Sequence, residues 1–206
     1  MGVKQAPVPV GERAEPGDSM LVLSSPLSTE TDTTCTDLLT SVDDERIAAL
    51  WVTLLDAPGE RVRHWEHHCD ASPDEAAVIT VGDRRTVDVR PTIHGDTVTV
   101  SSVGSPRNLT RLGVEILDHL DQWSVEEDTQ VVLCFHSLTA FLQYLNVQEA
   151  FKFIHALTAE LTRAGAIAHF HMDPDAHDDR TVSTMLPLFR SVVELDDDGE
   201  WTYRSR

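Results

Sequence analysis

The sequence predicts an α/β domain with a mostly parallel sheet and helices on both of its faces. Short apolar segments typical of buried strands alternate with segments in which apolar residues recur every three or four positions, as in amphipathic helices. The chain has 206 residues, of which 41% are hydrophobic. This length suits one packed domain and is short for two.

The expected strands follow from their apolar composition. Residues 131–135 are five consecutive apolar residues, so we expect them to form a central strand with parallel neighbours, residues 20–23 among them. Asp198-Gly199 is a turn signal before residues 201–203, which predicts a C-terminal β-hairpin. Strands are predicted at 20–23, 48–55, 76–81, 97–103, 131–135, 166–170 and 191–195.

Two of the expected helices have recognisable ends. An apolar stripe runs through residues 109–123, and residues 105–106 (Ser-Pro) offer an N-cap and a first-turn proline. Asn146 and Glu149 have the spacing of a capping box before the second stripe, and Gly165 ends that helix. Shorter helical patterns lie at 33–40, 58–68 and 178–190.

The charge balance is strongly acidic. Thirty-five Asp and Glu residues against 16 Lys and Arg give a formal net charge of −19, and Lys4 and Lys152 are the only lysines. Such self-repulsion is tolerated at molar salt, where the screening length is about 3 Å. The composition is therefore typical of a haloarchaeal protein, with an acidic mesophilic protein as the alternative. Because no basic patch is present, we expect no binding to nucleic acid.

Domain limits and compartment follow from the remaining composition. Residues 1–18 carry Pro, Gly and mixed charge without periodicity, which predicts a flexible tail before a single domain at 19–206. No apolar run approaches a membrane span, and no basic segment precedes an apolar stretch at the N-terminus, so we expect a cytoplasmic protein without membrane contact. Cys35, Cys69 and Cys134 lack CxxC spacing and should be reduced, mostly buried thiols.

Residues 21–32 stand where a phosphate-binding loop would follow the first strand. Ligands of such sheets bind beyond the carboxyl ends of the strands. The segment reads Leu-Val-Leu-Ser-Ser-Pro-Leu-Ser-Thr-Glu-Thr-Asp, without glycine or lysine. Allowing one residue of misalignment, Glu30, Thr31 and Asp32 occupy the Gly-Lys-Ser/Thr positions of a working loop. Two carboxylates there would repel a polyphosphate, so we expect no nucleotide cofactor.

The second landmark of a nucleotide site is an aspartate that orients Mg²⁺ at the end of a strand. Here the apolar run 131–135 ends in His136 instead. Both nucleotide motifs therefore depart from the working pattern, and we expect no ATP hydrolysis.

With these departures, the chain still resembles the RecA/KaiC-like proteins of haloarchaea, in particular a small branch with degenerate Walker motifs. The segments that carry the resemblance are 20–40, 77–83, 105–120, 131–145 and 168–178, the last reading Ala-His-Phe-His-Met-Asp-Pro-Asp-Ala-His-Asp. The resemblance covers roughly residues 20–195 and implies a RecA-like (P-loop-type) sheet. It also implies assembly through protein partners or copies of the same chain. ATPase activity does not carry over, because both motifs are altered.

Five residues near the predicted ligand edge form a candidate site. Strand alternation places His169 and His171 on one face, and His136 ends a strand that we expect to be adjacent. His136, His171, Asp173 and His177 are the candidate ligands for zinc or another divalent metal. We favour a different interpretation, in which neutral histidines form a hydrogen-bonded network that braces the Asp-Pro-Asp turn without metal or catalysis. Acid/base catalysis is a third interpretation, although no convincing nucleophile accompanies the cluster.

Three function hypotheses follow from these observations. The first is a non-catalytic scaffold or signalling and regulatory protein that acts through protein partners. The second is a metal-dependent enzyme built on the histidine cluster. The third is a nucleotide sensor that binds without hydrolysis. Stoichiometric metal would favour the second and saturable nucleotide binding the third, whereas the first predicts neither.

Overall fold

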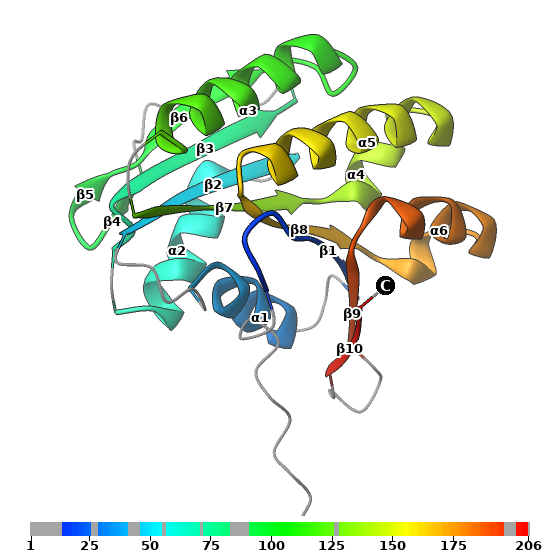
Figure 1. Ribbon diagram of the computed structural model, residues 1–206, viewed down its shortest axis with the longest axis horizontal. Helices are drawn as coiled ribbons and strands as arrows, with labels where there is room; N and C mark the ends of the chain where they lie inside the picture. The colour runs from blue at the N-terminus through cyan, green and yellow to red at the C-terminus, as the bar shows by residue number, and fades with distance from the viewer. Residues whose placement is uncertain are drawn as a thin grey trace, which may run out of the picture.

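The computed structural model describes residues 14–25, 29–40, 46–54, 57–70, 72–82, 91–125, 128–195 and 201–205, with side chains in the first helix from residue 35 onward. An eight-stranded sheet forms its centre (Figure 1). Its strands, in chain order, are β1 (Ser19–Leu23), β2 (Arg46–Leu54), β3 (Glu75–Val81), β6 (Thr99–Val103), β7 (Thr129–His136), β8 (Ile167–Met172), β9 (Ser191–Leu195) and β10 (Trp201–Ser205). A separate two-stranded sheet pairs β4 (Thr92–Ile93) with β5 (Asp96–Thr97).

The strands lie in the order β10-β9-β1-β8-β7-β2-β3-β6. All neighbours are parallel except β10, which runs antiparallel to β9. The predicted parallel α/β sheet with a C-terminal hairpin is thus confirmed, while the turn at 198–199 lies outside the described residues. β7 is central, as expected, but its neighbours are β2 and β8. The prediction that residues 20–23 lie beside it was wrong, because β8 is inserted between β1 and β7.

Helices cover both faces of the sheet (Figure 1). They are α1 (Thr29–Thr40), α2 (Pro58–His68), α3 (Leu109–Trp123), α4 (Leu138–Leu142), α5 (Val147–Arg163) and α6 (Asp179–Met185), with short 3-10 turns η2 (Pro174–Ala176) and η3 (Leu186–Leu188). In Figure 1, α1 and α2 lie on one face and α3, α4, α5 and α6 on the other. Within the described part of the chain, no helix is long and apolar enough to cross a membrane.

Strand alternation separates two hydrophobic clusters, one on each face of the sheet. Phe135 of β7 points to the α5 side, where its ring contacts those of Phe141 and Phe170 at centroid distances of 5.4 Å. On the α1 side, the Trp51 and Trp65 rings meet edge to face at 5.6 Å. Central strands buried on both faces explain why their sequences are continuously apolar.

The ends of two long helices test the sequence prediction locally. The capping box of α5 is confirmed, because Asn146 Oδ1 accepts from Glu149 N at 2.9 Å and Glu149 Oε2 accepts from Asn146 N at 3.2 Å. The N-cap of α3 is Asn108, whose Oδ1 accepts from Arg111 N, and not a residue of 105–106. Ser105 instead begins the turn before the helix, because its carbonyl accepts from Asn108 N.

Residues 14–18, which we assigned to the tail, lie against the domain. Gly17 has a φ of +86° and its carbonyl accepts from Thr162 Oγ1 at 3.0 Å. Asp18 is buried and forms an ion pair with Arg190 at 3.0 Å. The folded part therefore includes this turn, which the tail boundary at residue 18 missed, while residues 1–13 lie outside the described residues.

Candidate functional site

The carboxyl ends of β1, β7 and β8 form the edge where a nucleotide would bind in a sheet of this type. Ser24 N donates to the carbonyl of Met172 at 3.2 Å, so the chain after β1 stays attached to the end of β8. A cavity of about 70 Å³ lies at this edge and is lined by Ser24, His136, Ser137, Thr139, His171, Met172 and Asp173. Since a water occupies about 30 Å³ of liquid volume and ligand pockets measure about 300–1,000 Å³, this cavity has water-sized capacity.

The residues at the expected phosphate-loop positions fall in the first helix. Glu30, Thr31 and Asp32 belong to the first turn of α1, which begins at Thr29. Their side chains, and the whole of residues 26–28, lie outside the described residues.

Three of the four candidate metal ligands from the sequence, His136, His171 and Asp173, line the cavity at the strand ends, but their nearest contacts differ. His136 ends β7 and is partly buried, and its ring lies 5.0 Å from that of His171. Asp173 and His177 instead surround Thr139 of α4: Thr139 Oγ1 accepts from Asp173 N at 2.9 Å and lies 3.2 Å from His177 Nε2.

The Asp-Pro-Asp turn is held by hydrogen bonds of its own. Asp173 Oδ1 accepts from Asp175 N at 3.1 Å and caps the 3-10 turn η2. Together with the Thr139 contacts, this bond ties the turn to α4, while the interpretation of the histidines as a structural network without metal stays a prediction. His171 does not take part, because neither of its ring nitrogens has a hydrogen-bond partner among the described residues.

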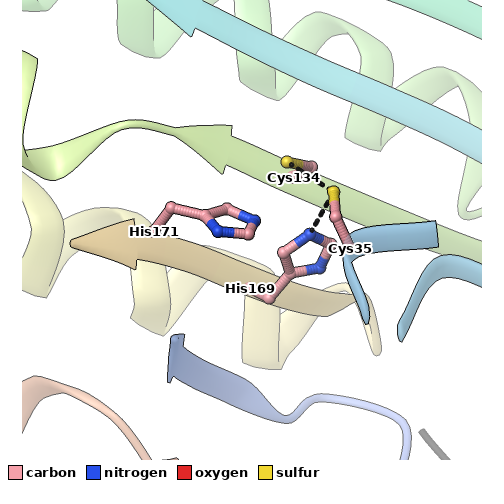
Figure 2. Close-up of side chains that lie close together, drawn as sticks. All are labelled: Cys35, Cys134, His169 and His171. Atoms are coloured by element: carbon pink, nitrogen blue, oxygen red, sulfur yellow. Dashed lines mark hydrogen bonds between the residues drawn. The ribbon is translucent and has the colours of Figure 1, made fainter. Parts of the chain in front are cut away.

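Four other donors converge instead under α1, and we name them the Cys2His2 cluster. Its members come from α1 (Cys35), β7 (Cys134) and β8 (His169 and His171), and all four are buried. Figure 2 shows the two cysteines and the His169 ring pointing toward one another, with the His171 ring beside them. One ligand atom from each member lies within 4.8 Å of every other. The Cys35 Sγ is 3.4 Å from the Cys134 Sγ and 3.2 Å from His169 Nε2.

Strand register explains why these side chains meet. Cys134 of β7 is the register partner of His169 of β8, so both point to the same face of the sheet. His171 lies two residues further along β8 on that face. Cys35 contacts these side chains from α1. Leu38 and Leu39 of the same helix are buried in the hydrophobic cluster that also contains Cys35 and Cys134.

Burial controls the electrostatics of the cluster. His171 is 3% exposed, and desolvation lowers its pKa to about 4, with the nearby Cys35 thiol opposing the shift. The pKa of Cys35 is lowered well below its usual value, first by the contact with Cys134 and then by the His169 ring, although burial opposes this. Neutral imidazoles and thiolates are the forms in which these side chains ligate a metal.

The sequence contained a signal for most of this cluster. Alternation on residues 166–170 already predicts His169 and His171 on one face, and the same rule places Cys134 on the face of His136. Cys35 carries no such signal, because its contact with Cys134 spans 99 residues.

Comparisons with known proteins identify the chain's relatives. The model of a family of unknown function, DUF7504, matches residues 17–195. The chain belongs to this family. No curated protein matches the sequence.

Solved structures resemble the chain in fold. One is the Pyrococcus horikoshii OT3 protein PH0250, with a TM-score of 0.61 and 14% identity over 93% of this chain and 87% of that one. Another is the flagellar accessory protein FlaH from Methanocaldococcus jannaschii, with a TM-score of 0.52 and 11% identity over 92% of this chain and 77% of that one. The DUF7504 chain therefore has a RecA-like fold.

Proposed function

We propose that this protein is a non-hydrolysing RecA-like scaffold that acts through protein partners or copies of itself. The observation that carries the proposal is the state of the nucleotide edge. The edge has a cavity of about 70 Å³ among the described residues, and the preceding segment 24–32 has neither glycine nor lysine. A polyphosphate needs both the close backbone approach of glycine and the charge of lysine.

The side chains at the edge support the loss of Mg²⁺-nucleotide chemistry. The strand that should present an aspartate presents His136, whose ring lies against His171. Asp173, the carboxylate among the described residues that line the cavity, caps its own turn, and its amide donates to Thr139 Oγ1. His136 and Asp173 thus make contacts within this edge of the sheet.

The overall charge supports the same proposal. A net charge of −19 opposes the approach of a second polyanion, and Glu30 and Asp32 add two carboxylates at the helix terminus that would otherwise attract phosphate. We infer that the protein works in the cytoplasm of a halophilic cell and does not bind nucleic acid.

The partner hypothesis draws on the RecA-like relatives. One of the similar structures is named a flagellar accessory protein. A chain that keeps the sheet and the helices while losing the phosphate loop retains surfaces for assembly, so we place this protein among accessory rather than catalytic components.

Calorimetry with Mg-ATP tests the proposal, in about 2 M KCl so that charge repulsion is screened. We expect no saturable binding below about millimolar ligand, corresponding to less than about 4 kcal/mol of binding free energy. A Glu30→Gln/Asp32→Asn variant serves as the charge control and should also fail to bind, because it still lacks the glycine and lysine. Micromolar binding by the parent chain, or ATP hydrolysis by it, would overturn the proposal.

A further inference from the structure

The Cys2His2 cluster has the donor set of a structural metal site. Two thiols and two imidazoles are the ligands that tetrahedral zinc takes in closed sites, with Zn–S near 2.3 Å and Zn–N near 2.0 Å. Ligand atoms around such an ion lie about 3.3–3.8 Å apart. The observed separations of 3.4 Å between the sulfurs and 3.2 Å from Cys35 Sγ to His169 Nε2 are close to these values, and no pair exceeds 4.8 Å.

We propose that the Cys2His2 cluster binds one zinc ion in a closed, four-coordinate structural site. Zinc fits the donors better than magnesium or calcium, which prefer oxygen ligands. Because all four positions around the ion are filled by side chains, no position is open for substrate, and the ion stabilises the fold. This site is distinct from the set His136, His171, Asp173 and His177, which shares only His171 with it.

Charge balance favours the ion at this depth. The cluster lies between α1 and the sheet, where an unpaired charge is costly. On binding, the two thiols lose their protons to solvent, and two thiolates neutralise Zn²⁺. The loaded site therefore carries no net charge, which makes it compatible with burial.

The unpartnered ring nitrogens are a second, independent observation that points to a ligand. Among the described residues, both ring nitrogens of His171 are buried without a hydrogen-bond partner. Buried polar atoms are nearly always partnered, and such exceptions are explained by an unseen water or ion among other causes. A zinc ion would take one nitrogen of His171, while the second imidazole ligand would be His169 Nε2, which faces the Cys35 Sγ.

The adjacent cavity supplies the outer partner that a zinc-bound histidine requires. His171 belongs both to the cluster and to the wall of the 70 Å³ cavity at the strand ends. A water there can accept the second ring N–H of His171 and fix the ring orientation.

The ion would join segments that are distant in the chain. Cys35 is separated by 99 residues from Cys134 and by 134 residues from His169. A link that closes long loops restricts the unfolded chain, so zinc bound to the native state should raise the melting temperature. This consequence does not depend on whether the protein binds nucleotide.

The first experiment measures metal in the tag-free, full-length chain. After purification under reducing conditions in about 2 M KCl, elemental analysis should find one zinc per chain. Chelation should lower the melting temperature by more than about 10 °C, a size typical of losing a tightly bound structural ligand in a chain of this length. Cobalt replacement should give the intense visible bands of tetrahedral Co²⁺ together with a thiolate-to-metal charge-transfer band.

Matched variants assign the metal to the cluster. Cys134→Ser should lose at least about tenfold in zinc affinity in competition with a chromophoric chelator, whereas Cys69→Ser, at a cysteine outside the cluster, should keep parental affinity. His169→Gln and the exposed-helix control His155→Gln form the second pair. If Cys134→Ser fails to fold, the cobalt spectrum of the parent chain decides the question alone. Absence of zinc after saturation, a cobalt spectrum without thiolate bands, or a Cys35–Cys134 disulfide under reducing conditions would overturn the proposal.

Discussion

Lowering the salt concentration should destabilise this protein sharply. The chain carries a net charge of −19, and the described ion pairs offset little of it. Arg46–Asp74 and Arg163–Asp121 are exposed on both sides, and Arg190 is exposed in its pair with Asp18. Exposed pairs contribute about 0–1 kcal/mol each. Long-range repulsion is therefore the dominant electrostatic contribution, and salt controls it.

The size of the effect follows from the compactness of the fold. A folded chain of this length has a radius of gyration of about 17 Å, against about 49 Å when it is unfolded. Coulomb repulsion is screened over about 10 Å at 0.1 M KCl and about 3 Å at 1 M. The self-repulsion of the folded chain then exceeds that of the unfolded chain by about 10 kcal/mol at 0.1 M and by about 4 kcal/mol at 1 M. Raising the KCl concentration from about 0.1 to about 1 M should therefore increase the free energy of unfolding by about 6 kcal/mol. This is comparable to the whole stability of a typical domain, about 5–15 kcal/mol.

Urea unfolding followed by circular dichroism at about 0.1 and 1 M KCl measures this difference. The control variant Asp70→Asn/Asp96→Asn/Asp118→Asn removes three exposed carboxylates. It should gain about 3 kcal/mol at 0.1 M but only about 1 kcal/mol at 1 M, because the repulsion scales with the square of the net charge. Equal unfolding free energies of the parent chain at both salt concentrations would refute the reasoning. A triple variant without gain at 0.1 M would show that KCl acts by another route.

Two further predictions concern single side chains. Asn146→Ala removes the cap of α5 and should cost about 1 kcal/mol in urea unfolding, while Asn146→Ser should retain most of the stability. Burial lowers the pKa of His119, with Glu115 and Asp118 opposing the shift, so the folded state resists its protonation. Above pH 6.5 the His119 side chain is neutral in both the folded and the unfolded chain, so it does not change the stability. Below pH 6.5 the unfolded chain takes up the proton more readily than the folded one, so the free energy of unfolding should fall. His119→Gln should weaken this acid sensitivity, and a melting curve as steep in pH as that of the parent would contradict the assignment.

The fold class could be predicted because its signals are local. The run at 131–135 is apolar on both faces, as β7 requires, and the Asn146–Glu149 spacing marked the start of α5. The strand order could not be predicted, because the position of β8 between β1 and β7 depends on packing between segments that are far apart in the sequence. The α3 cap was missed since Ser105 and Asn108 both suit an N-cap and only the helix start distinguishes them.

The candidate site was predictable in part for the same reason. Alternation correctly placed His169 and His171 on one face, and the contact between His136 and His171 agrees with the expectation that their strands are neighbours. Asp173 lies beyond the end of β8, where alternation no longer applies, and the turn directs it to Thr139 instead. Cys35 joined the cluster through helix packing, which no pattern within the sequence indicates.

If this protein binds no nucleotide, as we propose, the Cys2His2 cluster offers another way to hold the first helix on the sheet. In working relatives of the P-loop type, the phosphates and Mg²⁺ hold the start of the first helix against the strand ends. Here Cys35, in the body of that helix, contacts Cys134 and His169 directly beneath it. These contacts lie between α1 and the sheet and involve no residue of a phosphate loop, and His171 belongs both to the cluster and to the wall of the cavity at the strand ends. Under the proposed function, a helix held in this way needs no nucleotide to order it, so loss of the phosphate loop would leave the sheet and its helices in place.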